Sequence, residues 1–451
     1  MLLEQKAFMM SEHMLISFRH LIIIFTTAIT PVLAWGSSNV SDARFQKQQL
    51  ERIRPSLIDI NLNLSRVDSL TSRGSGFLAG RQDWIVTNFH VIERKLHRDA
   101  DHRLLVFGSK GQRFNARIIA VDVAADLAVL QSDHPLPGAV LKPYIEPLTK
   151  GEKLYAYGKS KGNDFKVSTG SFKKNIADGS VSELIFTGKL EAGMSGGPVL
   201  DEQGRLVGVN QSITLDFPYE SRLVNALHVQ KILIKAAQSP YGNSDTAIAD
   251  MIQQYRDMTA FEVDAITKPN KPKDWLGPFG VLTTDNICDH QLFSLADERF
   301  EIYRLKCETS NDDARVGEMN LGAIELRHYW MISRGGSAWR AAAASRYMME
   351  YLRKVPEPES REQGAWTCQF KRHTNTQNLK VDVQTCSRPY LRLPGLFDYR
   401  LRAALEVTDH ESMVSALEAD GIDPKNLERL TLAWLNRFER SKSVVTTVMK
   451  P

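Results

Sequence analysis

The chain has 451 residues, of which 43% are hydrophobic and 24% are charged, and its formal net charge at pH 7 is +4. At roughly 100–200 residues per domain, this length predicts two or three domains. The composition is that of a folded globular protein, which excludes a largely disordered chain, a collagen-like repeat and a protein with many membrane spans. So small a net charge over this length gives no reason to expect nucleic acid as a partner.

The N-terminus has the pattern of an export signal. An apolar stretch of 14 residues, Leu21–Ala34, follows a basic segment and ends with small residues at Val32 and Ala34. A membrane-spanning helix needs about 20 apolar residues, so the pattern predicts a cleaved secretory signal peptide over residues 1–34. A buried helix or an uncleaved anchor is the alternative. The expected location is the periplasm or the cell exterior, with no stable membrane span after cleavage.

The cysteines agree with export. All four lie late in the chain, and none forms the C-x-x-C spacing of a zinc ribbon: they are Cys288, Cys307, Cys368 and Cys386. They form two sets with separations of 19 and 18 residues, and pairing of near neighbours is one of three connectivities. Each such disulfide would stabilise the fold by about 3 kcal/mol. Four buried thiols in a cytosolic protein are the alternative.

Residues 41–238 are predicted to form an all-β domain that ends in a helix. Ile58–Leu64 alternates apolar and polar residues strictly, as a half-buried strand does. Short apolar runs closed by turn residues then follow without a long helix between them, and they are Ser75–Leu78, Trp84–Thr87, Leu104–Phe107, Arg117–Val121, Leu127–Gln131, Lys153–Tyr157, Phe165–Thr169, Leu184–Thr187, Pro198–Leu200 and Leu206–Asn210. This pattern favours an antiparallel barrel or sandwich. Asn225–Ala237 has the periodicity of a closing helix.

The second half has a different pattern. Ser244–Ile266 is predicted to be helical, and the polar, proline-interrupted segment Lys268–Asp274 is a candidate linker. We therefore predict a helical linker over 239–270 and a separate C-terminal α+β domain over 271–451. This domain is expected to contain the cysteine-bearing strands and two helices, Ala338–Arg353 and Glu411–Phe438.

Three short blocks carry residues suited to acyl transfer. The first places His90 directly after an apolar strand, where a general base has rigid support, and the second places Asp126 before another strand. The third, Glu191–Leu200, sets Ser195 among glycines that let the backbone aim amide groups at one point. Singly, His90 and Asp126 read more simply as a strand-end histidine and a turn aspartate, and the glycine run as a tight hairpin.

Together and in this order, the blocks resemble the trypsin-like serine peptidases, and within them the HtrA/Deg type of bacterial envelope protease. The resemblance covers about residues 50–238, and further segments that carry it are Gly74–Phe77, Phe114–Asp122, Ala156–Gly158, Val167–Gly170, Leu200–Asn210 and Asn225–Leu233. It implies an all-β double β-barrel. It also implies a triad in which Ser195 is the nucleophile, His90 the general base and Asp126 the residue that orients the imidazole.

The resemblance further implies an oxyanion hole made by the amides of Gly193 and Ser195, with no cofactor and no metal. Polypeptides are the expected substrates. The primary pocket is expected to be lined by residues before the nucleophile and by the strand Val207–Ser212, with Lys189, Leu190, Val209 and Asn210 as the candidates. Lys189 would favour acidic side chains, although a lysine in a short loop more often points to solvent.

Two other functions remain open. Gly193–Gly197 also fits the G-x-S-x-G elbow of an α/β-hydrolase esterase, but that elbow needs a helix after the serine and a later acid and histidine. His228, His290 and His328 follow the serine, though none sits in a recognisable block. The second alternative is a pseudoprotease that uses the barrel as a binding scaffold.

The chain departs from the HtrA pattern after residue 240, where we find no carboxylate-binding loop of a PDZ domain. Residues 271–451 resemble no family that we recognise. The hypotheses for this region are recruitment of substrates, contact with an envelope protein partner, or gating of the active site.

Overall fold

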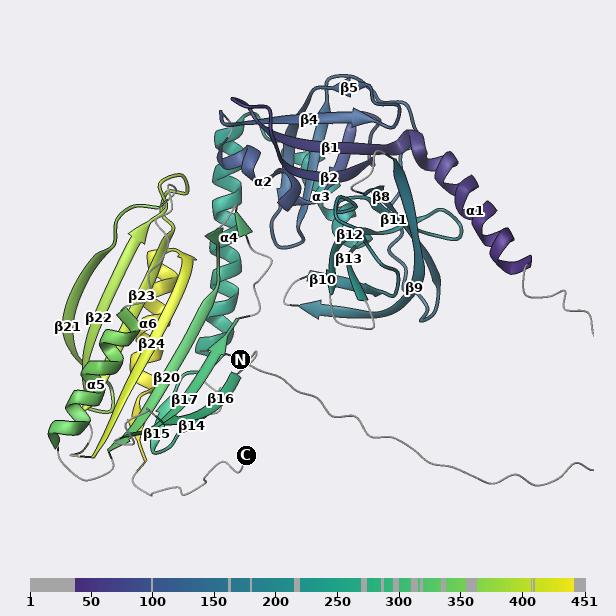
Figure 1. The fold of residues 1–451 in the computed structure, drawn as a ribbon. Coiled ribbons are helices and arrows are strands. Elements are labelled where there is room, and N and C mark those ends of the chain that lie inside the picture. Colours follow the sequence, from purple (N-terminus) through teal and green to yellow (C-terminus); the bar gives the residue numbers. More distant parts are fainter. Residues whose placement is uncertain are drawn as a thin grey trace, which may run out of the picture. The chain divides into compact units, whose positions relative to one another are not determined.

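The computed structural model describes residues 37–98, 100–160, 164–178, 181–214, 220–268, 274–284, 288–294, 300–309, 315–316, 319–333, 338–353, 363–406, 408 and 410–441 (Figure 1). The predicted signal peptide over residues 1–34 and residues 269–273 of the predicted linker lie outside these ranges. Met1–Lys47 and Gln48–Pro451 are two units, and helix α1 (Ser37–Ile53) begins in the first of them. In the described residues, no helix is long and apolar enough to cross a bilayer.

The first sheet is antiparallel and curls almost into a barrel. Its strand order is β5-β4-β1-β2-β3-β7-β6, with bounds β1 Leu57–Leu64, β2 Leu70–Leu78, β3 Trp84–Thr87, β4 His102–Gly108, β5 Arg113–Phe114, β6 Ala116–Asp122 and β7 Leu127–Ser132. The two edge strands, β5 and β6, are joined by the single residue Asn115, so the edges meet there. Among the described strands no ladder pairs β5 with β6, so this sheet is a half-barrel, and the predicted double β-barrel is confirmed only in part.

The second sheet is a closed barrel, as predicted. Its order is β10-β13-β12-β11-β8-β9, and the strands are β8 Lys153–Lys159, β9 Phe165–Asp178, β10 Val181–Phe186, β11 Pro198–Asp201, β12 Leu206–Thr214 and β13 Glu220–Asn225. Pairing of β9 with β10 completes the ring. Helix α3 (Ala226–Gln238) follows, and the Asn225 side chain caps it by accepting a hydrogen bond from Leu227 N.

Two further helices complete this part of the chain. Helix α2 (Phe89–His97) begins one residue after β3, and the sequence pattern alone does not predict this short helix. Helix α4 (Ser244–Thr267) agrees with the predicted helix and starts with a capping box between Asn243 and Thr246. It packs against α2 and β6. The division of the chain at residues 238 and 270 stays a prediction.

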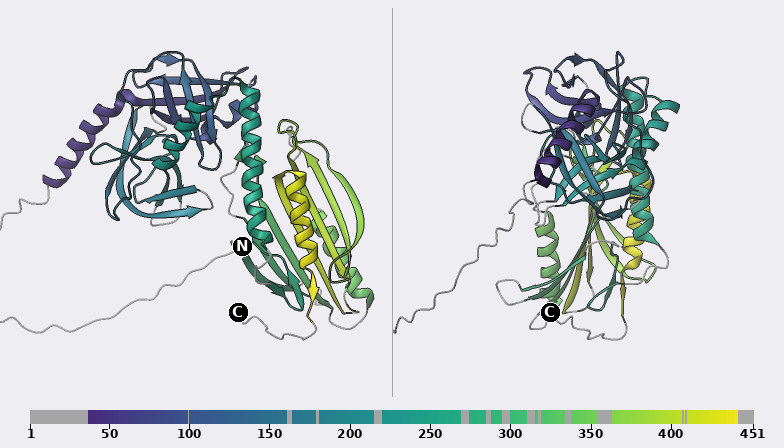
Figure 2. Two further views of the ribbon diagram at one scale, coloured as in Figure 1. Left: turned by 180° about the vertical axis from the view of Figure 1, so that it is seen from behind. Right: turned by 90° about the vertical axis from the view of Figure 1, so that its right-hand side faces the viewer.

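The C-terminal region is built on an open antiparallel sheet with the order β16-β17-β20-β24-β23-β22-β21. Its strands are β16 Cys288–Ser294, β17 Phe300–Glu308, β20 Ile324–Ser333, β21 Thr367–Thr374, β22 Lys380–Pro389, β23 Phe397–Glu406 and β24 Glu411–Ile422. Short ladders join β14 Asp274–Leu276, β15 Phe279–Val281 and β25 Glu439–Arg440, and also β18 Arg315–Val316 and β19 Met319–Asn320. Figure 2 shows helix α5 (Ala338–Arg353) and helix α6 (Pro424–Arg437) on opposite faces of the large sheet.

The prediction of one helix over Glu411–Phe438 is wrong for its first half, which is strand β24. This strand lies in the middle of the sheet and is covered on both faces: Val414 and Ala416 pack with α5, while Met413 and Leu417 belong to the core that includes α6. Apolar residues on both faces remove the alternation that marks a half-buried strand. Asp423 then caps α6, with Pro424 in its first turn.

Both edges of the C-terminal sheet carry a disulfide. Cys288 on edge strand β16 is bonded to Cys307 directly opposite on β17, and Cys368 on edge strand β21 is bonded to Cys386 on β22. The S–S distance is 2.04 Å in each. The near-neighbour connectivity is therefore the one present, and each bond ties an outermost strand to the next one in.

Candidate active site

His90 and Asp126 form a hydrogen-bonded pair. His90 is the second residue of α2, and its Nδ1 lies 2.7 Å from Asp126 Oδ2, while its backbone N donates to Asp126 Oδ1 at 2.9 Å. The Asp126 side chain is 10% exposed and that of His90 is 43% exposed. A nearly buried carboxylate thus fixes both the position and the tautomer of an accessible imidazole, because Nδ1 must carry the hydrogen that faces it.

The turn before β7 holds Asp126 in an uncommon backbone conformation, with φ 51°. Its carbonyl accepts hydrogen bonds from Phe89 N at 3.1 Å and from Asn88 Nδ2 at 2.8 Å. Main chain and side chain of Asp126 therefore both bind the start of α2. Strained left-handed residues persist where their surroundings over-determine them, and these four hydrogen bonds do so here.

Ser195 lies in a tight turn between Glu191 and β11. Gly193 and Gly196 have φ 95° and 83°, and a Cβ on Gly193 would come within 2.5 Å of Lys159 O. A Cβ on Gly196 would meet Ser75 O at 2.3 Å and Thr87 Oγ1 at 2.4 Å. Glycine is required at both positions because side chains are excluded by conformation and by space. The turn consequently packs against Thr87, three residues before His90.

The nucleophile candidate itself is partly exposed. Its Oγ donates a hydrogen bond to the carbonyl of Gln211 at 3.2 Å, and its own carbonyl accepts one from Ser75 N at 2.7 Å. Among the described residues, none accepts a hydrogen bond from the amide of Gly193 or of Ser195. Two donors beside the hydroxyl are therefore available to an external acceptor.

The buried side chain of Ser75, for which the sequence predicts no role, hydrogen-bonds to the main chain of this turn. It is fully buried, and its Oγ donates to Gly193 O at 2.8 Å and accepts from Lys159 N at 2.8 Å. Thr87 Oγ1 in turn donates to Ser75 O at 2.7 Å. A serine between two glycines in an apolar strand was the available signal, because small residues there allow another backbone to approach closely.

The four predicted pocket residues have different surroundings. Leu190 is buried in the core of the closed barrel, whereas Lys189 is exposed and its carbonyl accepts a hydrogen bond from Ser168 Oγ at 2.6 Å. Val209 and Asn210 are both fully buried. The Asn210 amide donates to Tyr157 O at 2.8 Å and to Met194 O at 3.1 Å, so it braces the nucleophile turn.

Glu191, which precedes the nucleophile turn, forms an ion pair with Lys166 on strand β9. Lys166 Nζ lies 3.3 Å from Glu191 Oε2. Hydrogen bonds from Lys166 and Ser160 lower the pKa of the Glu191 carboxyl, which keeps it ionised. Within the described part of the chain, no three histidine, cysteine, aspartate or glutamate side chains are grouped so that they could hold a metal.

The context of Ser195 does not fit an esterase elbow. The residues after the serine form strand β11 and not a helix, and His90 and Asp126 both precede the serine in the chain. His228 is buried and accepts a hydrogen bond from Ser182 N at 2.9 Å, and the side chain of His290 lies outside the described residues. The elbow interpretation is therefore dropped.

Comparison with known proteins gives matches over this part of the chain. Residues 74–209 match the family model described as trypsin-like peptidase domain. "Protease Do-like 1, chloroplastic" of Arabidopsis thaliana is 29% identical over 216 residues, which are 41% of this chain and 47% of that protein.

Two bacterial relatives are similarly related. "Serine protease Do-like HtrA" of Lactococcus lactis is 29% identical over 207 residues, covering 42% of this chain and 48% of the relative. "Probable periplasmic serine endoprotease DegP-like" of Halomonas elongata is 31% identical over 147 residues, covering 32% and 30%. The chain thus spans less than half the length of each of these relatives.

Proposed function

Residues 74–209 are a trypsin-like peptidase domain of the HtrA/Deg type, and on that premise we propose that the protein is a serine endopeptidase that acts through an acyl-enzyme on Ser195. The observation that carries the proposal is the imidazole of His90, held at Nδ1 by the nearly buried carboxylate of Asp126 at 2.7 Å. An oriented base beside a serine in a glycine turn is the arrangement that activates a hydroxyl.

In the proposed reaction, Ser195 Oγ attacks the scissile carbonyl carbon while His90 Nε2 takes the hydroxyl proton. The proton passes to the leaving amine as the C–N bond breaks, and water then hydrolyses the ester with His90 as base again. Asp126 stabilises the imidazolium. The hydrogen bond from Ser195 Oγ to Gln211 O is given up when the hydroxyl turns toward the imidazole.

The amides of Gly193 and Ser195 bind the oxyanion of the tetrahedral intermediate, since no described residue occupies them. A single donor of this kind is typically worth about 3 kcal/mol of transition-state stabilisation. Ser75 supports this role because its hydroxyl fixes the carbonyl of Gly193.

For substrate binding we assign the Lys189 side chain to the primary pocket of a polypeptide substrate, and Leu190 to its backbone wall, because the Leu190 side chain is buried in the barrel core. Val209 and Asn210 also contribute to this wall, since their side chains are buried. Lys189 is exposed and would attract acidic side chains.

We further propose that the protein is exported to the periplasm or secreted. Three observations support this: the apolar stretch Leu21–Ala34, the two disulfides of the C-terminal sheet, and relatives whose names include "periplasmic". Substrate recruitment or contact with an envelope protein is the role proposed for residues 271–451.

The test is labelling with a fluorophosphonate probe, which reacts quickly only with an activated serine. Wild-type protein, Ser195→Ala and Ser69→Ala are treated side by side, and labelled peptides are mapped. Ser69 is an exposed serine in the turn between β1 and β2 and serves as the matched control. We expect labelling at Ser195 in wild type and Ser69→Ala, and none in Ser195→Ala.

Hydrolysis of a fluorogenic peptide and of an unfolded protein substrate should follow the same pattern. An unlabelled, folded wild-type protein without hydrolysis would overturn the proposal and favour a binding scaffold.

A further inference from the structure

Helix α4 lies beyond the residues matched by the peptidase family model, yet one of its side chains binds the main chain that leads to Asp126. Gln254 Oε1 accepts a hydrogen bond from Val123 N at 2.8 Å, and Gln254 Nε2 donates to Val121 O at 3.0 Å. The side-chain amide of Gln254 thus pairs with one backbone N–H and one backbone C=O of the segment Val121–Val123, as the backbone of a neighbouring strand would.

The residues held in this way begin the turn that ends at Asp126. Asp126 N donates to Val123 O at 3.2 Å, and Ala125 N donates to Asp122 Oδ1 at 3.0 Å. The turn then reaches the left-handed conformation of Asp126. Since that conformation is unfavourable for a residue with a side chain, the position of the carboxylate depends on how firmly the start of the turn is fixed.

A partly buried polar network fixes the Gln254 amide itself. Its Nε2 also donates to Asp250 Oδ2 at 2.6 Å, and the same carboxylate accepts hydrogen bonds from Lys235 Nζ at 2.8 Å and Tyr241 Oη at 2.5 Å. Partial burial would raise the pKa of Asp250, but the hydrogen bonds from Lys235 and Tyr241 outweigh it and lower the pKa, so the group is ionised. The Gln254 Nε2 group faces two acceptors, the Asp250 carboxylate and the Val121 carbonyl, and its Oε1 faces a donor, Val123 N. Rotating the amide by 180° would place donor against donor and acceptor against acceptor, so only one orientation fits.

Apolar packing holds α4 against the two elements that carry His90 and Asp126. Tyr255, next to Gln254, is fully buried in a core that contains Val91 and Ile92 of α2 and Val123 of the turn. The helix therefore contacts the element that carries His90 as well as the turn that carries Asp126.

We propose that Gln254 is a positioning residue for the active site, which acts by holding the turn that presents Asp126 to His90. The inference rests on the proposed peptidase function and adds α4 to the machinery that function requires. Gln254 contacts no reacting atom, so its effect passes through Asp126.

The test compares Gln254→Met, which keeps the side-chain length and removes the two hydrogen bonds to the turn and the one to Asp250, with Gln253→Met. Gln253 is exposed on the same helix and donates only to Asp257 at 2.9 Å, so it is a matched control. Misplacement of a catalytic group by about 1 Å costs up to about 100-fold, and we expect Gln254→Met to lower kcat by about 10- to 100-fold with little change in KM. The rate of fluorophosphonate labelling should fall by the same factor, and Gln253→Met should match wild type.

Two readouts separate positioning from general loss of structure. The final extent of labelling counts competent sites, and it should stay at the wild-type level while the rate falls. The apparent pKa of His90 in the pH profile of kcat/KM should also decrease, because a displaced carboxylate stabilises the imidazolium less. Should Gln254→Met fail to fold, Gln254→Asn, which shortens the reach by one methylene, is measured in the same way.

A double-mutant cycle tests whether the effect of Gln254 on activity passes through Asp126. Because Gln254 acts through Asp126, adding Gln254→Met to Asp126→Ala should produce no further loss. An equal loss in both backgrounds, or equal activities of Gln254→Met and Gln253→Met, would overturn the inference. Absence of hydrolysis and labelling in the wild type would instead overturn the proposed function, so the two failures are distinguishable.

Discussion

The peptidase region and the C-terminal region differ at the edges of their sheets. The barrel β8–β13 has no edge, and the sheet β1–β7 curls until its two edge strands meet at Asn115. The C-terminal sheet stays open, and a disulfide ties each edge strand to its neighbour. Unpaired edges invite association with other chains, and closure removes the edge, whereas a disulfide holds the edge strand to its inner neighbour and leaves it as the edge of the sheet.

The difference indicates what each region depends on. In the peptidase region the site is held by backbone turns, glycines, hydrogen bonds and apolar packing, and the four cysteines of the chain are all elsewhere. In the C-terminal region the distinguishing features are covalent bonds and a fully buried histidine. Changes in the first region should therefore alter activity more than stability, and changes in the second should do the reverse.

The largest effect is expected for Asp126→Asn, which leaves the size of the side chain unchanged. An amide cannot stabilise the imidazolium and favours the wrong tautomer, so kcat should fall by about 10⁴-fold. The control is Asp68→Asn, an exposed aspartate that shares the left-handed backbone with φ 48°. Peptide hydrolysis and urea unfolding of both variants check this, and a large loss of stability in Asp126→Asn with normal kcat per folded molecule would contradict it.

Removal of one disulfide should produce the next largest effect, and on stability alone. Replacing Cys368 and Cys386 by alanine, or Cys288 and Cys307, frees a loop of 18 or 19 residues and should cost about 3 kcal/mol of unfolding free energy. Urea denaturation measures this, and kcat/KM for a small peptide should not change under native conditions. Loss of peptide hydrolysis in a variant that remains folded would contradict the expectation that changes in the C-terminal region affect stability and not activity.

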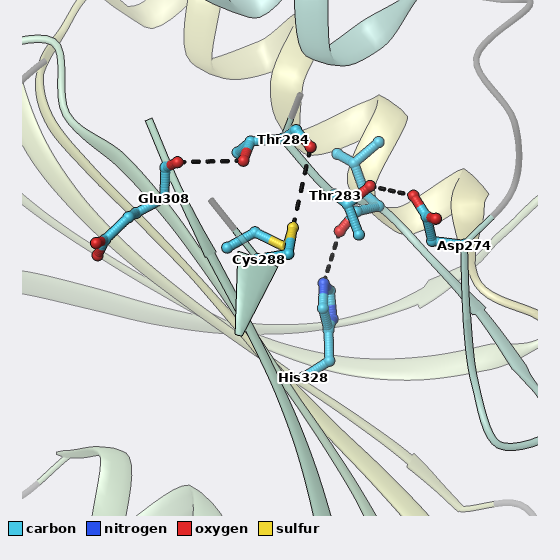
Figure 3. The surroundings of a disulfide bond; sticks show 8 residues. Asp274, Thr283, Thr284, Cys288, Glu308 and His328 are labelled. Atoms are coloured by element: carbon cyan, nitrogen blue, oxygen red, sulfur yellow. Dashed lines mark hydrogen bonds between the residues drawn. A yellow bond between two sulfur atoms is a disulfide. The ribbon is translucent and has the colours of Figure 1, made fainter. Parts of the chain in front are cut away.

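The smallest effect concerns pH. His328 (Figure 3) is fully buried, and its Nε2 lies 2.7 Å from Leu282 O. Its Nδ1 lies 2.8 Å from Ser415 Oγ, which itself accepts a hydrogen bond from Trp434 Nε1. Figure 3 also shows the segment after Leu282 held on both sides, with Thr283 bonded to Asp274 and Thr284 to Glu308. Burial lowers the pKa of His328 to about 4, from 6.5 in the unfolded chain.

The folded protein therefore binds fewer protons than the unfolded chain between these two values. The stability that the neutral imidazole contributes is complete above pH 6.5 and is lost as the pH falls toward 4. Between pH 7 and pH 5 the wild type should lose about 2 kcal/mol that His328→Gln does not lose. Unfolding at both pH values, with exposed His134→Gln as control, checks this, and identical pH dependence of His328→Gln and wild type would contradict it.

The sequence predicts the candidate catalytic residues of the site better than it predicts the residues that hold them in position. His90, Asp126 and Ser195 could be found because each lies in a local block whose residue types are constrained. The contribution of Gln254 could not be found, because it binds residues more than 130 positions earlier and lies in an ordinary amphipathic helix. Ser75 shares this property, since its hydroxyl binds a turn 118 residues later in the chain.

The fold followed the same rule. Helices α4 and α5 were predicted from their periodicity, and β24 was mistaken for a helix because central strands lose alternation. The half-barrel form of the first sheet could not be predicted, because closure depends on a ladder between β5 and β6 and on no local pattern.

The cross-links of the C-terminal sheet also bear on how the chain matures. Each disulfide closes within one hairpin, β16–β17 or β21–β22, and joins cysteines that are consecutive in the chain. On the proposed export route, an oxidant that joins consecutive thiols as they emerge from a translocation channel would make both bonds correctly, without the reshuffling of mispaired disulfides that an isomerase provides.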